Sequence, residues 1–381
     1  IFLLCCFLVF SSKESNAHSV LSNGTWVQIS VSESGVYKIT YDDLVSWGFK
    51  DIKSVALFGN GAGELSLMND ALLPDTLHEI AIWLEKGNDN VFNSGDYILF
   101  YGQSPHVWSY NETNKNFSHQ THSYSDKNYY FITTTRTPTK FISAQTALSS
   151  PETATISSYD NLQVHELNET NFLNSGREFF ETISSSKTIS FNSDNVLTNA
   201  EADVTFAIAA RHSSTAIVSI AANGSLLGTM SFSPCSRNNP YARLKIQSYT
   251  FIPSSEKTSF TIAQNYSGAN SKSCLDYCML HTRCSLKINN NEQLLFRDSY
   301  SIAENGIGKF QLTTDSQNSI WNITNPENPN NLSTQFSNGT TSFKASTENL
   351  HEYVAFSSDF KSVQFEKAIV NQDILSDTSP D

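Results

Sequence analysis

The sequence predicts a mainly β, multi-domain protein: a β-rich N-terminal domain, then β-sandwich-like domains, with few short helices. The chain has 381 residues, which at about 100–200 residues per domain indicates two or three domains. It contains 25 Phe and 15 Tyr but only 3 Met, a balance typical of strands. Short alternating segments separated by turn residues recur along the chain, which is also typical of sandwiches.

The first β-rich domain is predicted over 18–135. Thr40 followed by Asp43 is the pattern of a capping box, so a short helix is expected to run to Trp47 and to stop at Gly48. Alternating or aromatic-rich segments bounded by turn residues predict strands over 26–31, 36–39, 54–58, 78–83, 96–102 and 129–133.

The rest of the chain is predicted in three parts. Residues 136–158 are rich in Thr, Ser and Pro and are interpreted as a linker. A β-sandwich-like domain follows over 159–299, with a short helix near its start that ends close to Gly176. A third β segment covers 300–366. Because an isolated segment of that size buries little surface, we expect it to pack onto a domain outside this chain, and limited proteolysis to remove 300–381 first.

The first residues are typical of an export signal. Residues 1–10 are all apolar, and as a helix they would span only ~15 Å, half of a bilayer's hydrocarbon core. Residues 15–17 form a small-x-small cleavage site before His18. We therefore predict a signal peptide over 1–17, truncated at its start, and an exported protein.

Charge and cysteine content restrict the function classes. The net charge of −13 argues against binding to nucleic acid, which needs Lys/Arg stripes. Four cysteines lie beyond the predicted cleavage site: Cys235, Cys274, Cys278 and Cys284. On a straight strand Cys274 and Cys278 would share a face about 13 Å apart, too far to bond each other. Four free thiols and one bridge that includes Cys235 or Cys284 both remain open.

Two groups contain residue types found in catalytic or metal sites, but their spacing along the sequence does not fit such a site. A cysteine nucleophile needs a nearby His, yet Cys278 and His281 are an odd number of residues apart and would face opposite sides of a strand. His119 and His122 have only Asp126 as a nearby carboxylate, so a hydrophilic loop explains them better than a metal site. We predict no catalytic, cofactor or metal residues in this chain.

Other polar clusters have structural explanations. Asp42, Asp43 and Asp96 could ligate Ca²⁺, but helix capping and turn formation account for them. The glycine cluster at 59–63 lacks the Gly-Lys-Ser/Thr of a phosphate loop and is interpreted as a turn. Trp321, followed by two Asn-Pro steps, is expected to be buried and to anchor the third segment to its neighbours.

Eight segments, in this order, carry a resemblance to a known family: GVYKITYDDLVSWGF (35–49), VALFGNGAGEL (55–65), DYILFYGQSPHVWSY (96–110), HSYSDKNYYFIT (122–133), SGREFF (175–180), LDYCML (275–280), IWNITNPENP (320–329) and EYVAF (352–356). Together they resemble the N-terminal, non-catalytic region of the PorU-type sortases of the type IX secretion system, relatives of the gingipain cysteine peptidases. The sequence departs from that pattern at Phe179-Phe180, where Trp is expected in the pair, and at Cys274 and Cys278.

The resemblance implies a scaffold whose catalytic part is elsewhere. In the family a caspase-like α/β domain with a catalytic His and Cys follows, so 367–381 would be the lead-in to a domain absent from this chain, where Ca²⁺ is also conceivable. The complete protein would remove C-terminal sorting domains from secreted cargo and attach the cargo to anionic lipopolysaccharide through a thiolate nucleophile. Its partners would be that cargo and other outer-membrane components of the attachment complex, at the cell surface of a Gram-negative bacterium.

A second hypothesis needs no missing domain. The absence of catalytic residues and the many aromatic strands also fit a stand-alone cell-surface β-sandwich protein that binds glycan or protein. Sequencing the encoding DNA past the codon for Asp381 separates the two hypotheses.

Overall fold

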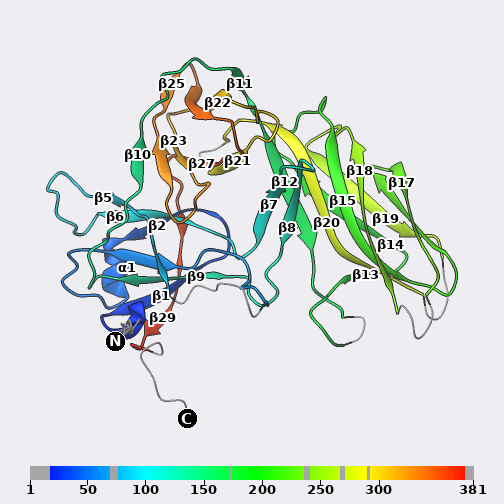
Figure 1. Cartoon of the computed structure of the whole chain (residues 1–381), viewed down its shortest axis with the longest axis horizontal. Coiled ribbons are helices and arrows are strands. Elements are labelled where there is room, and N and C mark those ends of the chain that lie inside the picture. Colours follow the sequence, from blue (N-terminus) through cyan, green and yellow to red (C-terminus); the bar gives the residue numbers. More distant parts are fainter. Residues whose placement is uncertain are drawn as a thin grey trace, which may run out of the picture.

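The computed structural model describes residues 18–68, 76–171, 174–235, 241–266, 271–289 and 292–373. It is nearly all β, as predicted, and its sheets form three β-sandwiches (Figure 1). The predicted signal peptide over 1–17 and residues 374–381 of the predicted lead-in lie outside the described residues. No helix among the described residues is both long and apolar enough to cross a membrane.

The first sandwich encloses a core between two sheets. One sheet has the order β29 (Gln364–Ile369), β1 (Trp26–Val31), β9 (Asn128–Thr133), β3 (Ala56–Gly59) and β4 (His78–Ile80). The other has the order β28 (Lys361–Ser362), β2 (Gly35–Thr40), β6 (Tyr97–Gly102) and β5 (Trp83–Glu85). Ile29, Leu57 and Tyr130 of the first sheet are buried against Ile39 and Phe100 of the second.

The single α-helix of the described residues forms where the capping pattern predicts it. The 3-10 turn η1 (Val20–Ser22) precedes β1, and α1 (Tyr41–Ser46) follows β2. The Thr40 hydroxyl accepts from the Asp43 N–H, and the Asp43 carboxylate accepts from the Thr40 N–H, which satisfies two donors that the first helical turn leaves unpaired. Gly48 follows with φ of 96°, a conformation that glycine adopts without strain, so the helix ends there as predicted.

One predicted strand is divided between the two sheets. Residues 78–83 are predicted as a single strand, but β4 ends at Ile80 and β5 begins at Trp83 in the opposite sheet. Ala81 and Ile82 are buried where the chain crosses, so the apolar run continues through the crossing and hides it from sequence inspection.

The second sandwich lies over residues 158–285. One sheet has the order β12 (Ser158–Glu166), β20 (Lys272–Ser285), β15 (Ala202–Arg211) and β18 (Arg243–Phe251), and β13 (Glu181–Ile183) also pairs with β20. The other has the order β14 (Ser186–Asn192), β19 (Lys257–Gln264), β16 (Ala216–Ala222) and β17 (Ser225–Phe232). Phe206 and Leu280 face Ile220 and Phe260 across its core. The short helix predicted near Gly176 is not found among the described residues, since 158–166 is strand β12 and the described residues up to 180 carry only an isolated bridge.

A β-bulge in β20 changes the faces of its cysteines. Leu275 pairs with Ile208 and Tyr277 pairs with Ala207, so Asp276 is an extra residue in the ladder. The strand is therefore not straight, and the expectation that Cys274 and Cys278 share a face is wrong. Cys278 points into the sandwich core, whereas Cys274 packs with Phe180 on the outer side of the sheet.

The third sandwich draws strands from several parts of the chain. One sheet has the order β10 (Ser143–Gln145), β24 (Asn330–Leu332), β23 (Ser319–Asn322), β27 (Glu352–Phe356) and β21 (Leu294–Arg297). The other has the order β11 (Ala154–Ile156), β22 (Ile307–Thr313), β26 (Thr340–Ser346) and β25 (Gln335–Ser337). Phe296 and Tyr353 pack against Phe310 and Phe343, whose rings stack with centroids 4.8 Å apart.

The segment 136–158, predicted as a linker, therefore supplies two edge strands. β10 and β11 each pair in parallel with a strand of the third sandwich. β11 contributes a single side chain, Ile156, to the third core, so strands this short carry no alternation that a Thr/Ser/Pro-rich composition would reveal.

The third sandwich is also packed onto the first. Trp321 is 2% exposed and lies in a second apolar cluster with Val36 and Tyr101, so its predicted burial is confirmed. The Gln293 side chain accepts from the Val36 N–H (2.7 Å) and donates to the Val36 carbonyl (2.9 Å). Because this region has its own core and a partner within the chain, it is no isolated segment, and the reason for expecting its early proteolytic loss does not hold.

Candidate ligand-binding cleft

A two-stranded hairpin extends from the first sandwich to the second. Within the described residues, strands β7 (Val107–Asn111) and β8 (Asn116–Gln120) pair only with each other. In Figure 1 the hairpin lies beside β12 and β20, between the first and second sandwiches. Phe117 is buried, with its ring edge-on to His281 at 5.4 Å, so the hairpin is packed against the outer face of the sheet.

A buried hydrogen bond between a histidine and a carboxylate fixes the hairpin. His119 Nε2 lies 2.7 Å from the carboxylate of Glu166 in β12, with both side chains largely buried, and Thr121 donates to the same oxygen (2.8 Å). Burial would raise the pKa of Glu166, but the hydrogen bonds from His119 and Thr121 outweigh it and leave that pKa below its usual range. The carboxylate is therefore held charged where it anchors the hairpin.

Replacing this carboxylate should loosen the hairpin. For Glu166→Gln we expect hydrogen exchange in β7 and β8 to speed up about tenfold, since the charge-assisted hydrogen bond becomes a neutral one. Hydrogen-exchange mass spectrometry is the measurement, and Glu112→Gln, in the exposed hairpin turn, is the matched control. Unchanged exchange in the Glu166 variant would show that apolar packing alone holds the hairpin.

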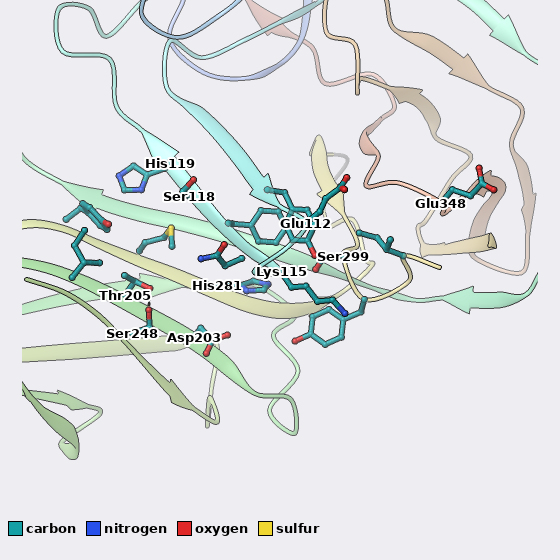
Figure 2. Close-up of a pocket in the computed structure, with 18 residues that line it drawn as sticks. Glu112, Lys115, Ser118, His119, Asp203, Thr205, Ser248, His281, Ser299 and Glu348 are labelled. Atoms are coloured by element: carbon teal, nitrogen blue, oxygen red, sulfur yellow. Dashed lines mark hydrogen bonds between the residues drawn. The ribbon is translucent and has the colours of Figure 1, made fainter. Parts of the chain in front are cut away.

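Beside the hairpin lies a cleft of about 870 Å³. Its wall is β8, from which four consecutive residues, 116–119, line the cavity, and its floor is the outer face of β20, β15 and β18. Figure 2 shows Thr205 and Ser248 on this floor, with Ser118 and His119 on the hairpin above. One end of the cleft is closed by Ser299, Tyr300 and Glu348, which belong to the part of the chain that forms the third sandwich.

A charged network underlies that end of the cleft. Asp160, whose side chain is fully buried, accepts from Arg283 Nη1 (2.7 Å) and from the Ser299 N–H (2.6 Å) and lies 2.9 Å from His281 Nε2. Arg283 also contacts Asp298 at 2.6 Å. These contacts join the second sandwich to the start of the third.

The network fits binding better than nucleophilic catalysis. Arg283 shares the Asp160 carboxylate with His281, and no hydrogen bond among the described residues joins His281 to a Ser, Thr or Cys side chain. Cys278 lies on the other face of β20, as the odd spacing predicts. A thiolate and a base therefore do not meet here.

In the described part of the chain Cys235, Cys274, Cys278 and Cys284 are free thiols, the first of the two alternatives that the sequence leaves open. Three of them are buried, and burial raises the pKa of Cys274, of Cys278 and, to about 11, of Cys284. Thiol chemistry at neutral pH needs the thiolate, so these three are unreactive in the folded protein.

Alkylation should therefore be selective. Iodoacetamide at neutral pH is expected to modify Cys235, which is only half-buried, at least about tenfold faster than Cys274, Cys278 or Cys284. Peptide mass spectrometry before and after unfolding in urea measures this, since the unfolded chain should react at all four. Rapid native labelling of Cys278 would contradict its place in the core.

The other residues weighed from the sequence have structural roles. His119, expected in a hydrophilic loop, is instead in strand β8. No group of three or more His, Cys, Asp or Glu in the described part of the chain has metal-site geometry. Asp96 accepts from the Gly87 and Asn93 N–H groups (2.9 Å each), which is turn formation as predicted.

The cleft itself was missed from the sequence. The strands at 107–111 and 116–120 flank the polar turn ETNK (112–115), and two short strands around a polar turn are a hairpin signal in the sequence. The face that the hairpin covers comes from strands later in the chain, from Glu166, 47 residues after His119, to His281, 164 residues after Phe117, and no local pattern shows those contacts.

Comparison with known proteins places the fold. No protein-family model and no curated protein matches the sequence. The chain superposes on the crystal structure of dimeric latent PorU from Porphyromonas gingivalis with a TM-score of 0.82 and 21% identity, covering 96% of this chain and 35% of that chain. It thus spans about a third of that protein's length.

Other matches are partial. The CBM36-1 domain of a multidomain xylanase from the hindgut metagenome of Trinervitermes trinervoides matches 32% of this chain and 96% of its own, with 10% identity and a TM-score of 0.22. A β-porphyranase from Bacteroides plebeius covers 69% of this chain and 35% of its own, with 10% identity and a TM-score of 0.23. Matches with TM-scores of 0.22 and 0.23 are too poor to support a conclusion. Because the superposition on PorU covers 96% of the chain with a TM-score of 0.82, the arrangement of three β-sandwiches is a PorU-like fold.

Proposed function

We propose that this chain is the N-terminal scaffold of a PorU-type cell-surface sortase. The observation that carries the proposal is the extent of the structural match: one superposition covers 96% of the chain, so it includes all three sandwiches together. A shared sandwich is common among unrelated proteins, but a shared arrangement of three is a much more specific likeness.

In this proposal the role of the chain is to hold other parts of the protein in place. Among the described residues its three sandwiches are joined at three packed contacts: the apolar cluster around Trp321, the ion network around Asp160, and the β7–β8 hairpin packed on the second sandwich. Such a braced body would hold a cysteine-type catalytic domain, attached after residue 381, in a fixed place relative to partners of the attachment complex. The whole protein would cleave sorting domains from exported cargo and transfer the cargo to anionic lipopolysaccharide at the outer membrane.

The experiment is to sequence the encoding DNA past the codon for Asp381. An open frame that encodes a strand-helix pattern with a His and, later, a Cys supports the proposal. The full-length protein, with that Cys replaced by alanine as the control, should then lose cleavage of a cargo that carries a C-terminal sorting domain. A stop codon directly after Asp381 would overturn the proposal.

One observation favours a second candidate function. The cleft beside β8 is large, open to solvent and lined by Tyr110, Tyr277 and Tyr300 as well as polar side chains. A stand-alone surface binding protein would use such a cleft and would need no catalytic domain. This candidate predicts the stop codon that the first excludes.

A further inference from the structure

We propose that the cleft beside β8 binds an extended peptide that adds a strand to the free edge of β8 and carries a basic residue. This inference does not depend on the proposed function, because a scaffold and a stand-alone protein could both use the site.

The first argument is the free strand edge. β8 pairs with β7 alone, so along its other edge alternate backbone N–H and C=O groups lack a ladder partner within the part of the chain that the structure describes. Residues 116–119 line the cleft consecutively, which places that edge along the cavity. A strand edge of this kind is a template for main-chain hydrogen bonds to an extended segment.

The second argument is that the edge is rigid. The hairpin is held by the His119–Glu166 pair and by Phe117 packed on His281. A peptide that binds a fixed edge does not have to order the hairpin first, so little conformational entropy is lost on the protein side.

The third argument is the chemistry of the floor. A strand added to β8 would lie over the outer sheet face and direct alternate side chains towards it. Tyr277, Met279 and Ile246 supply apolar surface there, and the paired hydroxyls of Thr205 and Ser248 (2.7 Å) lie in the same row across the sheet as Met279. Alternate apolar side chains of the peptide fit this floor.

The fourth argument is charge. Three carboxylates line the cleft, on Glu112, Asp203 and Glu348, against the single lysine Lys115 among its lining residues. A lysine or arginine in the peptide would therefore be favoured, and a glutamate disfavoured. Backbone hydrogen bonds along an edge distinguish a peptide from an oligosaccharide, which has no regular donor and acceptor row to match β8.

The test uses two matched variants of β18. Ile246→Arg places a long side chain in the cleft, whereas Leu244→Arg makes the same change on the same face of the same strand, at a residue that does not line the cleft. Their side chains are similarly exposed, 57% and 52%, so neither change should disturb folding. Circular dichroism of both variants checks this.

The probe is a library of acetylated, fluorescein-labelled hexapeptides in which β-branched residues alternate with varied positions. We expect saturable binding by fluorescence anisotropy, enriched for Lys or Arg, and weakened about tenfold or more by Ile246→Arg but not by Leu244→Arg. N-methylation of alternate backbone amides in a binding peptide should weaken it about tenfold when the methylated groups face β8, and much less when the other set is methylated.

Two results would overturn the proposal. The first is no peptide binding up to about 1 mM with the unmodified protein. The second comes from a glycan array probed with the same three proteins: sugar binding lost in Ile246→Arg and kept in Leu244→Arg, without peptide binding, assigns the cleft to carbohydrate.

Discussion

The Asp160→Asn variant is expected to lower the free energy of unfolding by about 3–5 kcal/mol, among the largest effects of any single change in this chain. Asparagine keeps the shape of aspartate and removes only the charge. The guanidinium of Arg283, itself buried, would then keep only Asp298 as its counter-charge, and His281 would lose the carboxylate that it contacts. A buried charge that loses one of its two counter-charges is costly because water cannot take the place of the lost carboxylate.

Urea denaturation followed by circular dichroism measures this effect. The control is Asp203→Asn, an exposed aspartate of the same sheet that accepts a hydrogen bond from Thr250, for which we expect a change within about 0.5 kcal/mol. Equal stabilities of the two variants would show that the network around Asp160 is energetically neutral.

The same carboxylate should make stability depend on pH. Burial alone would raise the pKa of Asp160, but the hydrogen bond from His281 and the charge of Arg283 outweigh it and lower that pKa to about 2. A pKa that is lower in the folded state means stability that is present above the unfolded pKa of about 4 and is lost as pH falls towards 2. The wild-type protein should therefore lose more stability between pH 5 and pH 2 than Asp160→Asn does, by about 2 kcal/mol.

The second large effect is expected for Trp321→Ala, with a loss of about 3–5 kcal/mol. The indole is almost fully buried, packs edge-on to Phe356 at 4.9 Å and belongs to the cluster that joins the third sandwich to the first. Alanine would leave a cavity between two sheets that are each held by their own core, so the surroundings cannot collapse fully to fill it.

Hydrogen exchange distinguishes this mechanism from a general weakening. Exchange should speed up most in β27 and β6, whose residues Val354 and Leu99 lie in the same cluster, and least in β16 and β19 of the second sandwich. Phe336→Ala, at an exposed position of β25, is the control and should change stability by less than about 0.5 kcal/mol. A uniform increase across the three sandwiches would contradict a local role for Trp321.

Local sequence patterns predicted the fold class and many single elements. The Thr40–Asp43 capping box predicted α1, and alternation predicted β1, because both signals involve residues within a few positions of each other. The burial of Trp321 followed from its size and from the two Asn-Pro steps after it. These predictions needed no knowledge of distant contacts.

The features that the sequence did not predict depend on pairing between residues far apart in the chain. The bulge at Asp276 depends on how β20 meets β15, some seventy residues earlier in the chain, so a period-two pattern read from 274 to 278 placed Cys274 on the wrong face. Likewise β10 and β11 are strands only because the third sandwich offers them an edge. The cleft is lined by six separate stretches of the chain, 110–119, 203–205, 246–248, 277–281, 299–302 and 348, and its residues share no motif.

The pairing of β29 with β1 has a consequence for the order of folding. β29 covers one edge of the first sheet, yet it is made about 330 residues after β1, and it brings the two ends of the described chain together (Figure 1). The first sandwich therefore cannot complete its sheet until nearly the whole chain is available. During synthesis the β1 edge stays open to strands of other molecules, so this protein should depend on a holding chaperone until residue 369 has emerged.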